Sequence, residues 1–407
     1  MHSKAEFDCY RTWSLPAELW HSILSRVSFD ERLGVMPLVS HEWASALSGH
    51  SFAWEDLVLS HPPQDWSKLV GWAATHCKHT HQLTLEDLKS GNEEALQKLL
   101  ACSPALRSLK LAGGISGSPA LWSHLLAQRL QHLHIELDTV KQADIDSMSL
   151  MQGLKHLSLQ VSKPSQTSNV HIPGQLTTLT NLTSLALRNV SVAQGAVSDS
   201  FTKLSSLQDL TLIRSRISQF DFCFSSLQRL SSLLVSEDHR TGQVLSLPGL
   251  SELPTMRRLS ISSGLENFPD GVLGVTSLTS LDLGWNKFRM LPDGPYLRNL
   301  RELQFQERPS VLDARVLEKA VHLSLLSLDA THMTYKEIIA LVMELIRRLP
   351  KVQRVVLLKA SYNGEADRED QIAQSFLQLV NVLGEGKSIQ IQLEHKWRPL
   401  LWSDVTR

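Results

Sequence analysis

One six-residue pattern, apolar-x-x-apolar-x-apolar, recurs along this chain at intervals of 22 to 34 residues. The cleanest copies are LRSLKL at Leu106, LKHLSL at Leu154 and LTSLDL at Leu278. The fourteen copies begin at Trp54, Thr80, Leu106, Leu130, Leu154, Leu182, Leu207, Leu230, Met256, Leu278, Leu300, Leu323, Val352 and Gly386. A period in this range predicts a solenoid, in which one short structural unit is stacked many times. Thr80 and Gly386 are polar or small at a position that is otherwise apolar, so the end copies fit less well.

Each copy predicts a short strand. Side chains alternate between the two faces of a strand, so the fourth and sixth positions point inward together, and positions three, five and seven point outward. One unit cannot bury its apolar face alone, whereas stacked units form a continuous core. LxxL pairs also occur on ordinary helices, but fourteen copies at near-constant spacing favour a parallel sheet with return segments behind it.

The return segments differ along the chain. Apolar residues at helical spacing predict return helices near both ends of the repeat region. These helices are expected over residues 65–75, 92–102, 119–128, 335–348 and 370–383. In the middle the returns are short and carry Pro173, Pro269 or Pro292, which leaves no room for a long helix.

Two local features add to this prediction. Asn286 occupies the ninth position of its copy, where an amide can pair with backbone groups of the turn, a role that Ser215 and Thr331 fill less well. Residues 386–393 are expected to form the last strand, whose open edge the tail with Trp397 and Trp402 would cover.

The copies resemble the leucine-rich repeat over about six-sevenths of the chain. This resemblance implies an α/β solenoid: a curved parallel sheet on the concave side, with helical or irregular segments on the convex side. We expect about 12 to 14 repeats over residues 54–393, followed by a tail over residues 394–407.

Residues 13–50 precede the repeats and predict three short helices. Pro16 suits the first turn of a helix, and apolar residues then follow at four-residue steps from Leu19. Pro37 ends or kinks the second helix, and Gly49 follows the third as a C-cap. Three short helices within a segment of about 35 residues can bury only a small core. We therefore expect this segment to need a partner or the adjoining solenoid for stability.

This segment resembles the F-box, whose pattern is Leu-Pro-x-Glu-Leu, Ile-Leu and Val-x-x-x-Trp. The three parts match residues 15–19, 23–24 and 39–43, with one extra residue before Val39 and with Pro37 in the middle helix as departures. The resemblance implies docking on a Skp-family adaptor, and through it on a cullin-RING scaffold. The apolar anchors that it implies are Leu15, Pro16, Leu19, Ile23, Leu24, Leu33, Val39 and Trp43.

The combination implies the substrate-recognition subunit of an SCF-type (Skp-cullin-F-box) ubiquitin ligase, with no catalytic site or cofactor of its own. The repeat domain would hold an unknown target protein while a separate enzyme delivers ubiquitin. The alternative is a leucine-rich-repeat scaffold or structural protein, such as a ciliary or cytoskeletal one, whose N-terminal helices only cap the solenoid.

Composition narrows the environment and the partners. Lys plus Arg (40) balances Asp plus Glu (41), so nothing draws the whole chain to nucleic acid or an acidic membrane. The first eleven residues lack the apolar region of a signal peptide, and we expect no membrane segment. The four cysteines form no CxxC pair and no disulfide framework, which favours the cytoplasm or the nucleus.

Other chemistry-bearing patterns are weak. Residues 76–81 (HCKHTH) hold metal-ligand residue types at spacings that match no zinc pattern, and no nucleophile elbow or phosphate-binding glycine loop is found.

Because the return segments occupy the convex side, we expect the target protein to bind on the concave face of the sheet. Loops 162–173 and 359–369 are the competing sites. The large or charged outward-pointing residues are His132, His134, Arg188, Arg258, Asp282, Trp285 and Glu302.

Overall fold

The computed structural model describes residues 55–59, 66–89, 91–162, 176–190, 201–215, 224–237, 247–284, 286–287, 290–305, 314–329, 335–349, 351–358 and 390–394. Outside these ranges lie the whole F-box segment with its eight expected anchors, Trp285, the expected helix over 370–383, and the tail. The chain divides into two compact units, residues 1–138 and 139–407, which we describe separately.

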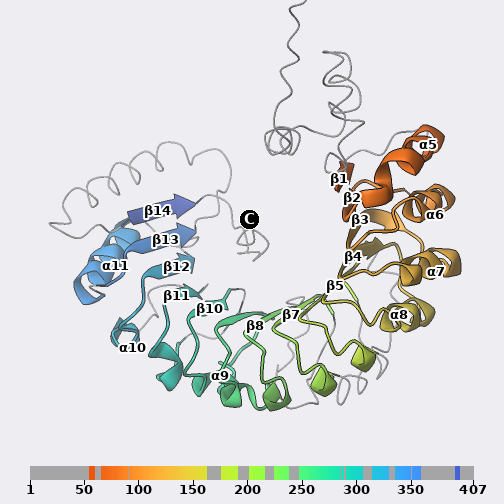
Figure 1. The fold of residues 1–407 in the computed structure, drawn as a ribbon. Helices are drawn as coiled ribbons and strands as arrows, with labels where there is room; N and C mark the ends of the chain where they lie inside the picture. Colours follow the sequence, from red (N-terminus) through yellow and green to blue (C-terminus); the bar gives the residue numbers. More distant parts are fainter. Residues whose placement is uncertain are drawn as a thin grey trace, which may run out of the picture. The chain divides into compact units, whose positions relative to one another are not determined.

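The first unit alternates strands with helices. Its parallel strands are β1 (Asp56–Leu59), β2 (Gln82–Leu85), β3 (Ser108–Ile115) and β4 (His132–Leu137). Its returns are α5 (Trp66–His76) with the 3-10 helix η2 (Cys77–His79), α6 (Glu93–Ala101) and α7 (Pro119–Ala127). The three helices stack in order along one side of the strands (Figure 1).

The second unit continues the same arrangement with shorter returns. Its strands are β5 (His156–Val161), β6 (Ser184–Arg188), β7 (Asp209–Ile213), β8 (Ser232–Ser236), β9 (Arg258–Ser262), β10 (Ser280–Leu283), β11 (Glu302–Phe305), β12 (Leu325–Asp329), β13 (Arg354–Leu358) and β14 (Gln390–Glu394). Its α-helices are α8 (Gln142–Ser149), α9 (Asp270–Leu273), α10 (Ala314–Leu317) and α11 (Tyr335–Arg348). The 3-10 helices are η4 (Leu176–Thr178), η5 (Phe201–Lys203), η6 (Phe224–Ser226), η7 (Leu250–Glu252) and η8 (Pro295–Leu297).

Neighbouring strands within each unit pair in parallel and in sequence order, with equivalent pattern positions opposite one another. Leu57, Leu83, Leu109 and Leu133 form one such row in the first unit. Thirteen of the fourteen strands begin two residues after the predicted start of their copy. This architecture is a leucine-rich-repeat type of α/β solenoid, which confirms the predicted fold class.

The fourteenth copy was placed wrongly. Val355 pairs with Ile391 and Leu357 pairs with Leu393, so the residue equivalent to Val352 is Ser388 and not Gly386. Both residues 389 and 391 are isoleucine, so the alternating apolar pattern fits two registers that differ by two residues.

The core lies between the strands and their returns. The first, fourth and sixth positions of a copy are buried, as Leu106, Leu109 and Leu111 show with 0 to 1% of their surface exposed. Thr80 is fully buried as well, so a threonine does occupy the first position of its copy. Burying such a leucine stabilises the fold by roughly 1.5–3 kcal/mol, and the repetition fixes the register of the strands.

The predicted helices agree with α5, α6, α7 and α11 to within one residue at each end, whereas α8 was not predicted. Four of the eight residues of α8 are buried, and only two of these, Ile145 and Met148, are apolar. The apolar periodicity of this helix is therefore weak. The carboxylate of Asp144 accepts a hydrogen bond from the backbone N–H of Lys141 at 2.8 Å, which helps to start the helix.

The turn after β10 is organised by Asn286, as its position predicted. Its Oδ1 accepts from the backbone N–H groups of Ser263 (3.3 Å) and Leu265 (3.1 Å). Its Nδ2 donates to the carbonyl oxygens of Ile261 (2.8 Å) and Leu283 (3.0 Å). One buried amide thus ties together the ends of β9 and β10. Ser215 is also buried, and its hydroxyl donates to the carbonyl of Leu187 at 3.3 Å.

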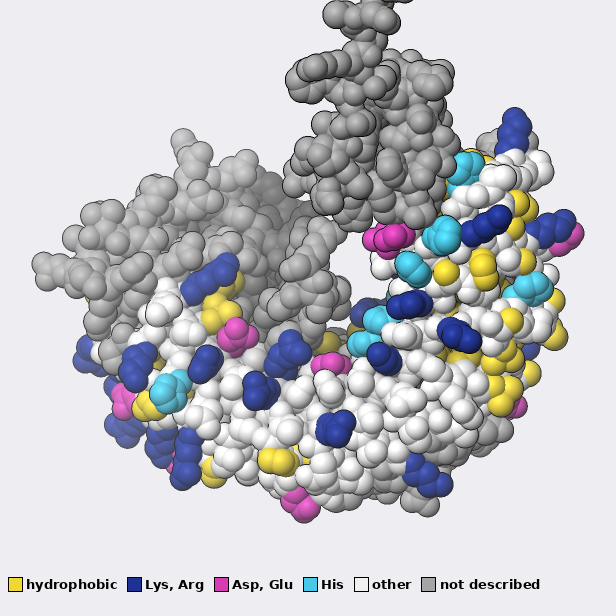
Figure 2. Space-filling view, viewed as in Figure 1, with side chains coloured by type: hydrophobic (Ala, Val, Ile, Leu, Met, Phe, Trp, Pro, Cys, Tyr) yellow, Lys and Arg dark blue, Asp and Glu magenta, His cyan; other side chains and the backbone are white. Residues whose placement is uncertain are grey.

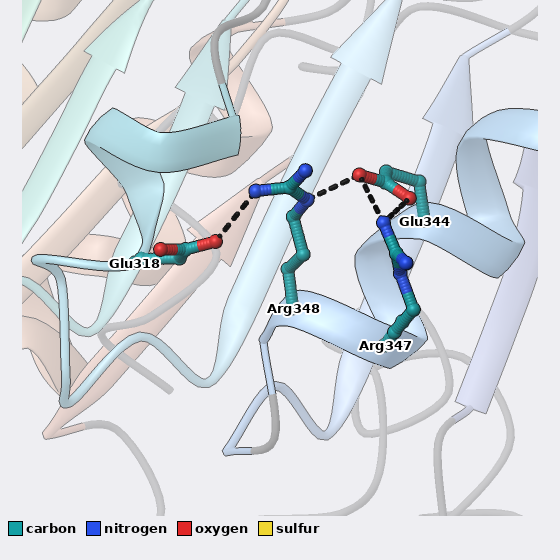
Figure 3. A network of polar contacts seen from close by, with 4 residues as sticks. All are labelled: Glu318, Glu344, Arg347 and Arg348. Atoms are coloured by element: carbon teal, nitrogen blue, oxygen red, sulfur yellow. Dashed lines mark hydrogen bonds and ion pairs between the residues drawn. The ribbon is translucent and has the colours of Figure 1, made fainter.

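Ion pairs also join neighbouring repeats on the helical side (Figure 3). Arg348 at the end of α11 pairs with Glu318 at 2.8 Å and with Glu344, which also pairs with Arg347 at 2.7 Å. These side chains are 29 to 70% exposed, so the network contributes little to stability and is more a feature of the helical surface than a site.

Candidate functional site

The sheet face opposite the return segments, which we call the outward face, carries positions three, five and seven of each repeat. Buried and accessible residues alternate along β4, where Leu133, Ile135 and Leu137 are buried and the residues between them are not. The alternation confirms that His132 and His134 point away from the core, as predicted. His132 is exposed and His134 is half-buried, and both belong to the first unit.

Four of the other predicted residues lie on the outward face of the second unit. Glu302 at the start of β11 is exposed, and Arg188 and Arg258 are half-buried at the end of β6 and the start of β9. Asp282 in β10 is only 7% exposed, so it is not the accessible charge that the pattern suggested. Trp285 lies outside the described residues.

A row of ionisable residues occupies position three of β5, β7 and β9. Arg258 and Asp209 form an ion pair with 3.6 Å between Nη2 and Oδ1, which reaches across β8. Burial raises the pKa of Asp209, and the nearby Arg258 opposes this effect. Burial lowers the pKa of His156, and Asp209 opposes that. The repeat pattern points position three outward, but the ion pair between Asp209 and Arg258 depends on the order and spacing of the strands, which the sequence alone does not show.

Arg188 is a cation on the outward face whose neighbours across the strands are uncharged. It lies opposite Gln160 in β5 and Ile213 in β7, neither of which can neutralise it. Burial lowers the pKa of its guanidinium, although the group remains charged at any physiological pH. An arginine held on a rigid strand in a half-buried setting is well suited to pair with a carboxylate of a protein partner.

Position five behaves differently, because its side chains are half-buried in β5 to β7 and buried from β8 to β13. Ser260, Asp282, Gln304 and Ser327 come from four successive strands, β9 to β12, and are 5 to 7% exposed. Asp282 accepts hydrogen bonds from the Ser260 hydroxyl (3.0 Å) and the backbone N–H of Gly284 (2.9 Å). Burial raises the pKa of Asp282, and these two hydrogen bonds oppose the effect.

The histidine- and cysteine-containing segment at residues 76–81 has structural roles. His76 stacks on Trp72 with 5.0 Å between ring centroids, and its Nδ1 lies 2.9 Å from the Trp72 carbonyl oxygen. Burial raises the pKa of the Cys77 thiol to about 11, which disfavours the thiolate that metal binding or nucleophilic attack requires. Within the described ranges, no three His, Cys, Asp or Glu side chains are grouped so that they could hold a metal ion.

The surface of the second unit is polar and mixed in charge. In Figure 2, uncharged polar side chains and backbone, drawn white, cover most of the described surface over the middle repeats, and the Lys and Arg side chains are scattered over it. Nucleic-acid-binding grooves, by contrast, have clustered cations and aromatic rings that stack on bases.

No helix within the described part of the chain is long and apolar enough to span a membrane.

Among known proteins, similarity to this chain is found in solved structures. No protein-family model matches the chain, and no curated protein matches it by sequence. An internalin from Listeria monocytogenes is similar at 14% identity over 82% of this chain and 94% of that one, with a TM-score of 0.46. A leucine-rich-repeat protein of Leptospira interrogans is similar at 15% identity over 86% and 98%, with a TM-score of 0.36.

Proposed function

We propose that this chain is the target-recognition subunit of an SCF-type ubiquitin ligase, without a catalytic site of its own. Residues 13–50 would dock on a Skp-family adaptor bound to a cullin-RING scaffold, and the outward face of the second unit would hold the target protein. The adaptor half of the proposal is supported by the F-box pattern of the sequence, in particular by Leu15-Pro16, Ile23-Leu24 and Trp43.

The target half is carried by one observation: charged side chains of both signs stand at defined positions on a rigid parallel sheet. Arg188 and Arg258 are half-buried and Glu302 is exposed, and the small Ser280 of β10 lies between Arg258 and Glu302. Arg188, Arg258 and Glu302 lie on β6, β9 and β11, and the fixed spacing of about 4.8 Å between adjacent strands holds them at set separations. Such a surface can discriminate a protein partner by charge complementarity, and arginine is one of the residue types enriched among the residues that dominate binding at interfaces.

The adaptor half is tested by the double substitution Leu15→Ala and Pro16→Ala. Burying apolar anchors of this size contributes roughly 1.5–3 kcal/mol each, so capture of a purified Skp-family adaptor should weaken by well over tenfold. Equal recovery of adaptor by the substituted and the unchanged chain would favour the scaffold alternative, in which residues 13–50 only cap the repeats.

The target half is tested by reversing charges on the outward face. The triple variant Arg188→Glu, Arg258→Glu and Glu302→Lys should lose its targets in proximity labelling while keeping adaptor capture and thermal stability. Asp282 is left unchanged, because a buried lysine at its position would disturb the fold. The matched control exchanges Glu94 and Lys98, an exposed ion pair on α6. Survival of all targets in the triple variant would refute this assignment.

A further inference from the structure

The segments that lead into the strands of the second unit carry positive charge and no negative charge. We call the four residues that precede each of the strands β5 to β13 the approach segments. None of their residues is Asp or Glu, although acidic and basic residues are equally frequent in the whole chain, at 41 and 40. The basic residues of the approach segments are Lys155, Arg229, Arg257, Arg298, Arg301 and Lys351.

These six cations are accessible and are not used inside the repeats. All six residues are exposed, and within the described part of the chain none of their side chains forms an ion pair or a hydrogen bond. Cations of the return segments differ in this respect, because Lys319 pairs with Asp293 and Arg348 pairs with Glu318. The approach segments therefore present a row of charges that only an anionic partner can neutralise.

Strand register holds the arginines of this row at fixed positions. Arg257 and Arg301 occupy the same place before β9 and β11, two strands apart, so their backbones are separated by about 10 Å. Their carbonyl oxygens accept hydrogen bonds from the hydroxyl groups of Thr279 (3.0 Å) and Ser324 (3.1 Å) in the next repeat, which fixes the backbone. Side chains alternate along a strand, so Arg257 points away from the outward face on which Arg258 lies. The approach segments thus form a surface separate from the outward face.

We propose that the approach segments of β9 to β11, through Arg257, Arg298 and Arg301, bind a segment of a partner protein that is rich in Asp and Glu. Each guanidinium would donate two parallel hydrogen bonds to one carboxylate of that segment, a geometry that suits arginine better than lysine. The proposal goes beyond the proposed function and does not depend on it, because the surface would serve a ligase subunit and a scaffold protein equally.

Two other anionic partners fit this surface less well. Nucleic acids are bound by densely clustered cations and by stacking rings, whereas the approach segments contain no Phe, Tyr or Trp. Membrane-surface segments combine clustered Lys and Arg with a broad apolar face that enters the lipid. Among the described approach segments one large apolar side chain is exposed, Val321, at the position equivalent to Arg298 in the next repeat. A single aliphatic side chain beside an arginine suits a peptide better than a lipid surface.

The inference is tested by selecting a phage-displayed library of random dodecapeptides on the purified full-length chain and on its triple variant Arg257→Glu, Arg298→Glu and Arg301→Glu. We expect the unchanged chain to select peptides rich in Asp and Glu. Synthetic copies of these peptides should bind the triple variant at least tenfold more weakly, and their binding to the unchanged chain should weaken as salt is added, because the charges are exposed.

The matched control changes the net charge by the same amount at other places. It carries Lys89→Glu, Lys203→Glu and Lys287→Glu, three exposed lysines outside the approach segments. The selected peptides should bind this control as they bind the unchanged chain. A peptide that loses affinity equally for the control and for the triple variant responds to the net charge of the chain, and that result would overturn the proposal.

Thermal unfolding separates recognition from a structural role. The triple variant should unfold at the same temperature as the unchanged chain, because the three replaced side chains are exposed and make no contact that the fold uses. A second variant, with Gln at the same three positions, removes the charges without adding negative ones. It should weaken the same peptides too, although by less than the charge reversal does.

Two further probes, oligothymidylate and vesicles that contain phosphatidylserine, distinguish the kinds of anionic partner. We expect the selected acidic peptides to bind the unchanged chain more tightly than either probe does. Tighter binding of oligothymidylate or of the vesicles, lost in the triple variant, would assign this surface to phosphate groups and overturn the proposal. Acidic peptides that bind the unchanged chain and the triple variant equally, or a selection without enrichment of Asp and Glu, would overturn it as well.

Discussion

The turn amide of Asn286 gives the sharpest prediction from the fold, because one side chain pairs four backbone groups at the ends of β9 and β10. Replacing it by alanine leaves two N–H groups and two carbonyl groups without partners in a buried setting. At a net 0.5–1.5 kcal/mol for each hydrogen bond, the expected loss of stability is about 2–6 kcal/mol.

The matched control is Asn299→Ala in the same repeat. Asn299 is exposed, and its Nδ2 makes one hydrogen bond, to the carbonyl oxygen of Thr276 at 2.8 Å. Water can replace that single bond, so the expected loss is below about 1 kcal/mol. The two substitutions remove the same chemical group from two positions of one repeat, and the number and burial of the hydrogen bonds differ.

Hydrogen exchange detected by mass spectrometry is the appropriate assay, because solenoid repeats contact mainly their neighbours and can open locally. Peptides that cover residues 258–287 should exchange at least about 30-fold faster in Asn286→Ala, since 1.4 kcal/mol corresponds to a factor of ten. Peptides from the first unit should be unchanged. If Asn286→Ala and Asn299→Ala exchange at the same rate, the buried amide does not stabilise this turn.

Three further predictions follow from backbone geometry, charge burial and strand pairing. Gly113→Ala should lower the melting temperature, because Gly113 has a φ of +113° and an added Cβ would lie 2.4 Å from backbone atoms of Leu88. The control Gly71→Ala in α5 places its Cβ where no atom lies within 4 Å, so it should raise the melting temperature. Asp282→Asn should raise the free energy of unfolding near neutral pH, because burial raises the pKa of Asp282 and its ionisation therefore costs stability as pH rises. In urea titrations this gain should shrink as pH falls from the raised pKa toward the ordinary Asp pKa, about 3.9, and vanish below it. A gain that is constant with pH would contradict this. Removal of residues 384–407 deletes β14 and exposes the paired edge of β13, so light scattering should detect aggregation, and a monodisperse product of unchanged stability would argue against it.

The inward half of the structure could be predicted from the sequence almost entirely. Leucines at positions four and six must share one face, and this requirement fixes both the strand and its register. The prediction failed where that signal is weak. Helix α8 faces the core with two apolar residues, Ile145 and Met148, and the last copy carries isoleucines two residues apart, which fit two registers equally. In both places the contacts of neighbouring repeats decide the structure.

The outward half could be predicted in direction but not in accessibility. The pattern places Arg258, Asp282 and Glu302 on one face, yet Asp282 is buried and Glu302 is exposed. Position five is flanked by residues of two neighbouring strands and by positions three and seven of its own strand, so its exposure depends on the sizes of all of them. A single sequence window does not contain those neighbours, because they lie 22 or more residues away.

This difference between the two faces explains how an unpaired group such as Nε2 of Gln304 can persist. The inward leucines contribute roughly 1.5–3 kcal/mol each, and an unpaired buried amide costs about 1–3 kcal/mol, the equivalent of one such residue. A solenoid with buried leucines in every repeat tolerates that loss without losing its fold. The outward residues that are accessible, such as Arg188 and Glu302, are therefore free to vary with the partner.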